Sequence, residues 1–408
     1  MLPERTLGST PMLNIAIATL AGVLAGMLGL LPFLHTNLVL ELISHPPGEV
    51  GAAYILALSF SHAAFELIPA VFVGIPSLAI AAGVLPAHQL ALQGKGRQAL
   101  GAMLDALLVS GVLAILLLPL ALVLLPPLYQ LIRPLTFFLL LLIVGALVHS
   151  EHTLPNKSIA LVVVALSGLV GHLLLGQRGE EPSVLFALLT GLFGIPGLLA
   201  SLKSASLPLG IPQPESPRPF LRWVLAGTIG GLLSSLLPAV SATMLSGLLL
   251  AGMEREPRTF LAVNSALTGS RIVFDAVATQ TLGKARSASA VAFQQVMVGS
   301  DAQALGTVLV AGLLALTLAV VLTRALTTIT LQPLARIQDK GWLSPVLFAT
   351  IVVGITVQTG WPGLVACACG AAIGALPVLT GVKRVHAMGC LVVPTLHYTA
   401  PSFPPVGL

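Results

Sequence analysis

Two pairs of ionisable residues stand within long apolar stretches of the sequence and have the spacing of one helix face. His62 precedes Glu66 by four residues, and Arg271 precedes Asp275 by the same interval. Side chains four residues apart are neighbours on a helix, so the members of each pair can reach each other. Ionisable groups are costly to bury among apolar residues and mark a functional pathway by default. These four residues are therefore the first candidates for chemistry.

The chemistry that fits them is the binding of an anion together with the uptake of a cation. We expect Arg271 to meet an anionic group and to belong to the substrate-binding set. We expect His62, Glu66 and Asp275 to handle a coupling proton or other cation, and all four to line a central cavity. The alternative is a structural ion pair within the bundle, such as Glu66 with Arg271.

A second set of candidate ligands follows two prolines that interrupt apolar runs. Pro32 and Pro238 each remove a helix hydrogen bond, and such breaks survive in lipid only where protein or a watery cavity receives the freed backbone groups. A helix that restarts after a break offers unpaired N–H groups to an anion. The expected substrate ligands at the breaks are His35, Thr36, Asn37, Ser241 and Thr243. The alternative is that small polar residues there only let helices pack closely.

The composition requires a membrane around these residues. Of the 408 residues, 56% are hydrophobic and 8% are charged, whereas soluble domains carry about 25% charged residues. The chain is therefore predicted to be a multi-pass protein of the cell (plasma or inner) membrane, with the lipid bilayer as its solvent. Its net charge of +5 is explained by cytoplasmic loops, so nucleic acid is not an expected partner.

The apolar runs predict a bundle of helices. Each run comes near or above the roughly 20 residues that a helix needs to cross about 30 Å of hydrocarbon, and continuous runs do not fit the alternating strands of a barrel. We expect an all-α polytopic membrane protein with about 10 to 12 membrane segments. Broken or re-entrant helices are expected between 51 and 92, with turning points at Pro69, Gly74, Pro76 and Pro86.

Two matches at nearly one spacing indicate that the chain is a duplicated unit. The segment 21–37 resembles 226–243, and the shared proline gives an offset of 238 − 32 = 206. The tetrapeptide Gln-Ala-Leu-Gly at 98–101 recurs at 303–306, at an offset of 303 − 98 = 205. Both offsets equal about half of the chain length, so the two matches support each other.

The duplication divides the chain into two transmembrane repeats. We expect the first repeat over 1–204 and the second over 205–408, within one membrane domain. The same offset makes Arg271 the counterpart of Glu66, because 271 − 66 = 205.

Loop charge indicates how the two repeats lie in the membrane, because Lys and Arg mark cytoplasmic loops. The loop at 45–49 has no Lys or Arg, whereas its counterpart carries Arg255 and Arg258. The next loop reverses this, since 93–97 holds two basic residues and its counterpart holds Asp301. Equivalent loops are thus predicted on opposite sides, as in the inverted-topology repeats of secondary transporters.

Two further groups of polar residues lie outside these segments. Glu151 and its flanking histidines have side chains that can bind a metal, yet their neighbours are those of a loop, so a solvated loop is expected instead of a metal site. The basic residues at 383–386 form a corner near the C-terminus, and topogenic charge explains them better than anion binding.

Four segments carry a family resemblance: 22–37, 61–76, 85–101 and 227–243. The most specific piece is Gly-Ile-Pro at 74–76, followed by a Gln-Gly-basic-Gly run. With these segments the chain resembles the large permease subunit of the tripartite tricarboxylate transporters (TctA-like), and more closely the short archaeal-type branch. The resemblance implies a secondary active carrier of a small organic anion, such as a carboxylate, driven by a proton or sodium gradient. It also implies a small membrane subunit or an extracytoplasmic binding protein as partner, and it is compatible with a homodimer.

A weaker similarity joins the chain to bacterial membrane proteins that return polyprenyl phosphate carriers across the bilayer. It makes a translocase of a lipid-linked phosphate the alternative function, with Arg271, Lys284 and Arg286 as the headgroup pocket. An enzyme is not expected, because the sequence has no Walker-type loop, no H-E-x-x-H and no Gly-x-Ser-x-Gly elbow. We predict no catalytic residue, no metal site and no cofactor beyond the coupling H⁺ or Na⁺.

Overall fold

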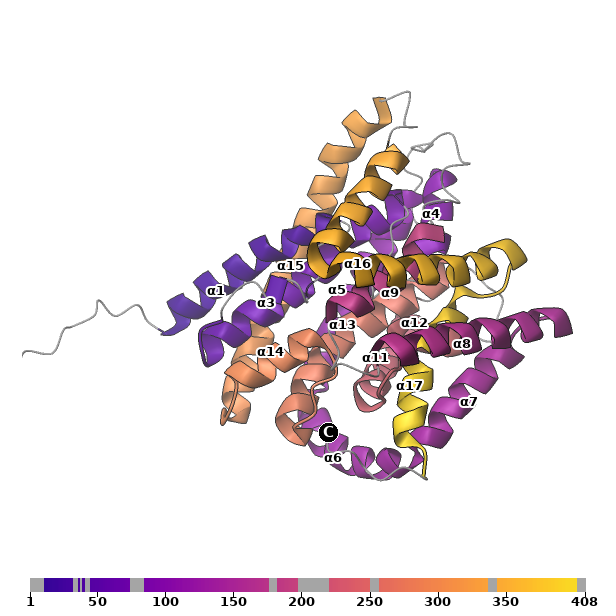
Figure 1. The fold of residues 1–408 in the computed structure, drawn as a ribbon. Coiled ribbons are helices and arrows are strands. Elements are labelled where there is room, and N and C mark those ends of the chain that lie inside the picture. Colours follow the sequence, from indigo (N-terminus) through magenta and orange to yellow (C-terminus); the bar gives the residue numbers. More distant parts are fainter. Residues whose placement is uncertain are drawn as a thin grey trace, which may run out of the picture.

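The structure, a computed structural model, describes residues 11–31, 36, 39–40, 45–73, 84–175, 182–196, 220–249, 257–336 and 343–401. Within these ranges every regular element is helical and none is a strand, which confirms the all-α class (Figure 1). The elements of the first half are α1 (Pro11–Gly26), η1 (Met27–Leu30), α3 (Glu49–Phe65), η2 (Pro69–Val73), α4 (Val84–Leu92), α5 (Gly96–Leu116), α6 (Leu118–Ile132), η3 (Arg133–Leu135), α7 (Thr136–His149), α8 (Leu154–Leu175), α9 (Pro182–Leu189) and η4 (Thr190–Gly194). Those of the second half are α11 (Phe220–Leu236), α12 (Ala242–Leu249), α13 (Pro257–Leu282), α14 (Ala288–Val296), α15 (Ala302–Arg336), α16 (Leu343–Thr380), η5 (Arg384–Met388) and α17 (Gly389–Thr399).

The lengths and compositions of the helices make the chain a multi-pass membrane protein. Seven helices in the described ranges are long and apolar enough to cross a membrane, and two shorter apolar helices lie at Val184–Gly194 and Leu221–Leu236. The expected count of about 10 to 12 was higher because it also included these two, the polar α13 and the two halves of α16 separately. Those halves meet at Gly360, whose φ of 61° is not helical.

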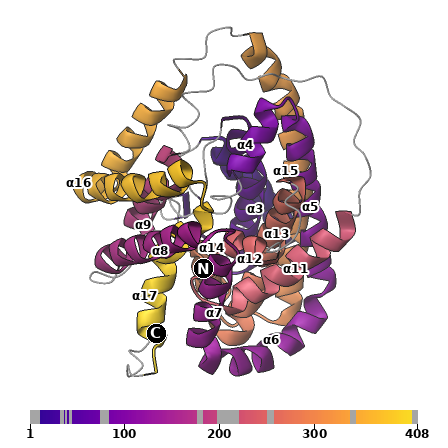
Figure 2. The same cartoon turned by 90° about the vertical axis from the view of Figure 1, so that its right-hand side faces the viewer.

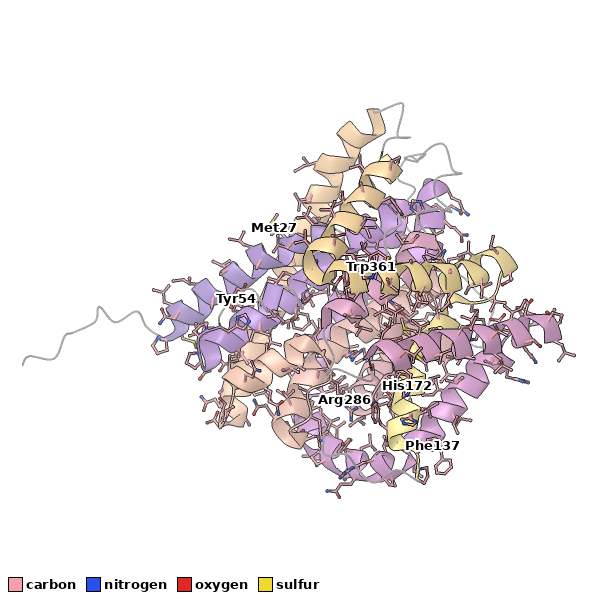
Figure 3. The ribbon with its side chains drawn as sticks, in the orientation of Figure 1. Met27, Tyr54, Phe137, His172, Arg286 and Trp361 are labelled. Carbon is pink, nitrogen blue, oxygen red and sulfur yellow. The ribbon has the colours of Figure 1, made fainter. Side chains whose placement is uncertain are left out.

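Two long helices, α3 and α13, lie at the centre, and several other helices expose apolar side chains. In the span Glu49–Phe72, which begins with α3, 94% of the most apolar window is buried, and α13 is buried along most of its length. The outer helices carry large apolar side chains on the surface, including Leu24 on α1 and Leu142 on α7. Trp361 on α16 is another, and it is labelled in Figure 3. Such surfaces suit contact with lipid tails.

The helices pack in a reciprocal pattern. α1 packs on α3 in the first half as α11 packs on α13 in the second, while α3 also packs on α15 and α13 on α5. In a second group, helices of the first half again pack on helices of the second half. α8 packs on α17, and α9 and η4 pack on α16. Figure 2 shows α8, α9, α16 and α17 on one side of the molecule and α3, α5, α13 and α15 on the other.

Small residues bring the paired backbones into close contact. A Cβ atom added to Gly26 on α1 would lie 2.4 Å from Ser61 Cβ and 2.9 Å from His62 N. A Cβ atom added to Gly231 on α11 would lie 2.1 Å from Ser270 Oγ and 3.0 Å from Arg271 N. Both distances require glycine, since a methyl group there would overlap the neighbouring helix.

The contacts along α3 show that its neighbours α1 and α15 run in the same direction as α3. Gly22 lies against Tyr54 and the later Gly26 lies against His62, so α1 and α3 advance together. Gly48 N donates to Val296 O shortly before α15 begins, and Gly312 further along α15 lies against Phe60.

The helices α5, α11 and α13 likewise run together, but opposite to α3. Gly227 lies against Val263 and the later Gly231 lies against Arg271. Arg258 donates to Gln98 at the starts of α13 and α5. α5 is antiparallel to α15, because the earlier Asp105 pairs with Arg324 whereas the later Gly111 lies against Leu313 and Leu316.

These directions place the starts of the helices at two ends of the molecule. The contact of Arg258 with Gln98 places the starts of α13 and α5 at one end. The contact of Gly48 with Val296 places the loop before α3 beside the loop before α15, at the opposite end.

The helix break expected at Pro238 is present. α11 ends at Leu236, a turn includes Pro238, and α12 begins at Ala242. Ala239 in this turn has a φ of 59°, in the left-handed region that costs a non-glycine residue free energy. Pro32 in the first half lies outside the described residues.

The close contact of α1 with α3 gives a prediction for stability. A Cβ atom added to Gly22 would lie 2.6 Å from the backbone oxygen of Tyr54, whereas one added to Gly145 on α7 meets nothing within 4 Å. We expect Gly22→Ala to lower the unfolding free energy by about 1–3 kcal/mol through overpacking, and Gly145→Ala to leave it unchanged or raise it slightly. Thermal unfolding of both variants in detergent measures this. Equal melting temperatures would contradict the close approach of the two backbones.

Candidate functional site

The central helices α3 and α13 place the two ionisable pairs deep in the molecule. His62 lies 62 − 49 = 13 residues after the start of α3, and Arg271 lies 271 − 257 = 14 residues after the start of α13. At 1.5 Å per residue both lie about 20 Å along their helices, within the span of a hydrocarbon layer of about 30 Å.

The pair on α3 is enclosed by protein. His62 Nδ1 and Glu66 Oε2 are 3.5 Å apart, and only 5% and 7% of the two side chains is exposed. Gly29 in η1, directly after α1, makes room for them, since a Cβ atom there would lie 3.3 Å from the His62 ring. A neutral imidazole leaves the carboxylate negative, whereas protonated His62 makes the pair neutral.

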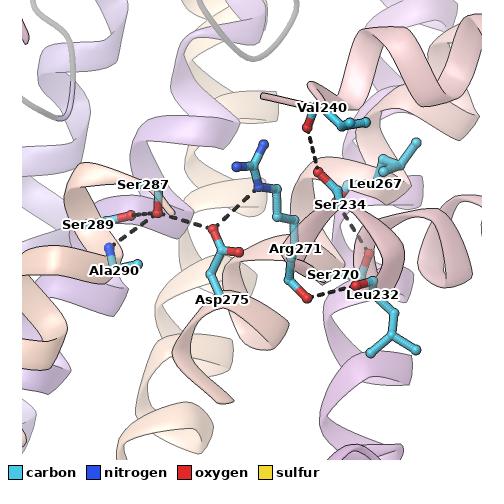
Figure 4. Close-up of polar contacts among 11 residues, drawn as sticks. Leu232, Ser234, Val240, Leu267, Ser270, Arg271, Asp275, Ser287, Ser289 and Ala290 are labelled. Atoms are coloured by element: carbon cyan, nitrogen blue, oxygen red, sulfur yellow. Dashed lines mark hydrogen bonds and ion pairs between the residues drawn. The ribbon is translucent and has the colours of Figure 1, made fainter. Parts of the chain in front are cut away.

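The pair on α13 is linked to the following helix. Arg271 Nε donates to Asp275 Oδ2 at 3.3 Å, and Ser287 Oγ donates to the same oxygen at 3.1 Å (Figure 4). Ser287 also caps α14 by accepting from Ala290 N. The second carboxylate oxygen, Asp275 Oδ1, is buried and has no hydrogen-bond partner among the described residues. Asp275 therefore retains one acceptor, and the 25% exposed side chain of Arg271 retains its terminal donors.

The packing corrects the expected pairing between the halves. Gly26 lies against His62, and Gly231 lies against Arg271 in the same way. The two glycines are 231 − 26 = 205 residues apart in sequence, whereas the two ionisable residues are 271 − 62 = 209 residues apart. Arg271 is thus in the position of His62, not of Glu66, and Asp275 is in the position of Glu66. The difference arises because the connection between α11 and α13 is four residues longer than the one between α1 and α3.

The two carboxylates have partners other than those of a cross-bundle ion pair. Glu66 pairs with His62, and Arg271 with Asp275, so each carboxylate has a partner on its own helix. Within the described ranges, no three His, Cys, Asp or Glu side chains come together as a metal-binding group.

The break after α11 supplies buried hydroxyl groups. Ser241 Oγ accepts from Met244 N and so caps α12, while Ser234 on α11 donates to Val240 O at 3.0 Å. Thr243 is fully buried, and its Oγ1 has no hydrogen-bond partner in the part of the chain that the structure describes. Of the two predicted ligands here, Ser241 therefore has a structural bond and Thr243 has an unused hydroxyl.

The structure describes one of the three predicted ligands of the first break. Thr36 is a half-buried helical residue, whereas His35 and Asn37 lie outside the described residues.

The basic residues between α13 and α14 lie in a returning loop. α13 ends at Leu282, Gly283 turns with a φ of 63°, and Ser287 comes back to Asp275. Arg286 lies in this half-buried loop, with its guanidinium 5.8 Å from the centre of the Tyr129 ring. The loop therefore adds positive charge to the surroundings of Asp275.

Comparison with known proteins identifies the family. The model of the tripartite tricarboxylate transporter TctA family matches residues 12–389, from α1 to the start of α17 and through both halves. The chain belongs to the TctA family. This TctA-family protein is accordingly a component of a transporter.

The TctA-family chain also has a relative of nearly equal extent. It is 24% identical over 402 residues to the uncharacterized protein MJ1079 of Methanocaldococcus jannaschii, covering 95% of this chain and 99% of that protein. No solved structure matches the chain.

A second polar cluster was missed by sequence reasoning. Glu151 is buried, not solvated, and its Oε1 lies 3.0 Å from His386 Nε2 and accepts from Lys383 N at 3.1 Å. Arg384 is also buried, so this basic corner is not only a topogenic surface charge. The two parts are 232 residues apart in sequence, and no local spacing joins them.

The buried pair on α13 gives a prediction for stability. Asp275→Ala removes the partner of Arg271 and of Ser287, so we expect the unfolding free energy to fall by about 2–4 kcal/mol. The exposed pair of Arg324 with Asp105, whose side chains are 49% and 44% exposed, is the matched control, and Asp105→Ala should cost about 0–1 kcal/mol. Thermal unfolding in detergent compares them, and equal losses would show that the α13 pair is not protected from solvent.

Proposed function

We propose that this TctA-family protein is a secondary active transporter of a small organic anion, with a carboxylate as the recognised group, coupled to a proton or sodium gradient. In this proposal Arg271 binds the anion, together with Thr243, Ser241 and the residues of the first break. His62, Glu66 and Asp275 take up the coupling cation. The observation that carries the proposal is an ionisable pair with a buried carboxylate on each of the two central helices.

The charges of these pairs support coupling to a cation. With neutral His62, the pair on α3 has a charge of −1, whereas the pair on α13 sums to zero and has the positive charge of Arg286 in its surroundings. An excess charge is costly in a medium that cannot solvate it. Addition of one proton or one Na⁺ brings the α3 pair to zero, and an anion that then joins Arg271 is favoured by the bound cation. This order of charges is the physical basis of symport.

The unused bonding groups support anion recognition at α13. The terminal nitrogens of Arg271 are donors that match a carboxylate in a two-point geometry. Its carboxylate partner, Asp275, is engaged through Nε. The buried Thr243 hydroxyl lies on α12, which packs against α13.

We propose further that residues 1–204 and 205–408 are inverted repeats with broken helices. Support comes from the directions of the helices, because α1, α3 and α15 run opposite to their counterparts α11, α13 and α5. The charges that precede the helices give independent support. α5 and α13, which follow basic stretches of the sequence, start at one end, whereas α3 and α15, which follow uncharged or acidic loops, start at the other. Inverted repeats with interrupted helices are a common architecture of secondary transporters.

The family supports a proposal for the setting of the transporter. We place it in the plasma or inner membrane of the cell, with the basic loops before α5 and α13 in the cytoplasm. A tripartite system implies further subunits, and a small membrane subunit or an extracytoplasmic binding protein is the proposed partner. A homodimer is a further arrangement that this proposal allows.

Anion binding at Arg271 can be measured in purified protein. We expect citrate or succinate to raise the melting temperature, and to do so more with Na⁺ or at acidic pH, because a ligand of the folded state stabilises it. Arg271→Gln combined with Asp275→Asn should fold with its charges balanced and bind about tenfold more weakly or worse. Glu66→Gln should bind without the dependence on Na⁺ or pH.

The control for these variants is Arg324→Gln, which removes an arginine from an exposed pair and should bind normally. Unchanged affinity in a folded Arg271 variant would remove this residue from the substrate site. Stabilisation by polyprenyl phosphate, with no response to carboxylates, would favour the lipid-phosphate translocase, for which Lys284 and Arg286 are the additional cations.

The inverted arrangement gives a separate prediction. Lys95 and Asp301 lie in the short loops before the counterpart helices α5 and α15. With the native cysteines replaced, Lys95→Cys should react with a membrane-impermeant maleimide only from the cytoplasmic side, and Asp301→Cys only from the other side. Labelling of both from one side of oriented vesicles would show that the repeats are not inverted.

A further inference from the structure

The second polar cluster contains a buried guanidinium with an unused edge. Arg384 begins η5, and the residue is 7% exposed. Its Nη1 donates to Phe193 O of η4 at 3.5 Å, a long contact. Its Nε and Nη2 are both buried, and neither has a hydrogen-bond acceptor in the described part of the chain.

The two unpartnered nitrogens share one edge of the guanidinium plane. In arginine, Nη2 is trans to Cδ about the Nε–Cζ bond. The N–H bond of Nε and one N–H bond of Nη2 therefore point in the same direction. This is the fork that binds two oxygens of one carboxylate or phosphate. A buried cation without a counter-charge is costly, so the missing acceptor is a strong indication of an oxyanion ligand.

The neighbouring acid does not neutralise Arg384. Glu151 Oε1 lies 3.0 Å from His386 Nε2 and accepts from Lys383 N, so this carboxylate is engaged by the other residues of the corner. Lys383 Nζ donates to Ser150 O at 3.0 Å. With neutral His386, two cations and one carboxylate leave the cluster with a charge of +1.

The cluster lies beside the broken helix. η5 packs against α12, and α12 also packs against α13, which carries Arg271. α12 is therefore in contact with the elements of both polar clusters. An anion held at Arg384 would lie next to the segment that restarts after Pro238.

We propose that Arg384 is the ligand of a second anion site, which binds one carboxylate or phosphate group through the edge formed by Nε and Nη2. Lys383 supplies a flanking positive charge, and Glu151 positions the corner through His386 and the backbone of Lys383. This site is separate from the one proposed at Arg271 and does not depend on it. Its ligand is either a free anion or the headgroup of an anionic phospholipid, since both present the same oxygens.

The test uses the full-length protein in a background that lacks the Arg271 site, with Arg271→Gln and Asp275→Asn. In lipid-free detergent, we expect succinate or inorganic phosphate to raise the melting temperature of this background. Adding Arg384→Met should weaken that response by about tenfold or more, because a charge-assisted fork is lost. The control Arg222→Met removes an exposed arginine and should keep the response.

The melting temperature without added anion separates a ligand site from a structural tether. If Arg384 serves an anion, Arg384→Met removes an uncompensated buried charge and should melt at or above the parent temperature. A lower melting temperature with an unchanged anion response would overturn the proposal. Arg384→Lys keeps the charge and loses the fork, so it tests binding if the methionine variant fails to fold.

Nanodiscs distinguish the two sources of the anion. A lipid headgroup is the ligand if phosphatidylglycerol stabilises the protein more than phosphatidylcholine does, if Arg384→Met loses this difference, and if succinate and phosphate have no effect in detergent. A response to soluble anions identifies a free carboxylate or phosphate. No Arg384-dependent response in either arm would end the proposal, whatever the Arg271 variants show.

Discussion

Burial of charge inside a membrane protein is the constraint on which this structure depends. Each of the two central helices carries a cation and a carboxylate one turn apart, and neither pair can face lipid without a large cost. α3 and α13 must therefore be enclosed by other helices over most of their length, as they are. The outer helices need no polar groups for this role, and their surfaces are apolar. The enclosing positions of α1, α5, α11 and α15 follow from this requirement.

Glycine makes the enclosure tight, and the packing direction that it sets determines the path of the broken helix. Because Gly227 and Gly231 bring α11 against α13 in the same direction, the chain between these helices must return through the thickness of the molecule. α12 and the turn at Pro238 lie on that return path. The break at Pro238 lies early in this connection, and Thr243 just after it is buried with an unused hydroxyl.

Sequence reasoning reached the helical class, the two ionisable pairs and the break at Pro238, because each depends on a local pattern. Spacing of four residues on a helix is enough to place His62 beside Glu66. It assigned the wrong counterpart to Arg271, because one constant offset cannot accommodate a connection that is four residues longer in the second half. It also missed the cluster of Glu151 with Lys383 and His386, since residues that lie far apart in sequence and outside any motif become neighbours only through the packing of α7, α8 and η5.

Equivalent positions of the central helices hold different chemistry, and this difference gives each half of the proposed transporter its own task. His62 changes its charge with one proton, whereas Arg271 is always charged. The carboxylates Glu66 and Asp275 are alike in type, so the contrast between the halves lies in the cation alone. A pair that varies between −1 and 0 suits the uptake of a coupling ion, and a pair with a fixed guanidinium suits the anion. In the proposed pair of repeats, the exchange of a histidine for an arginine is thus enough to separate the two tasks.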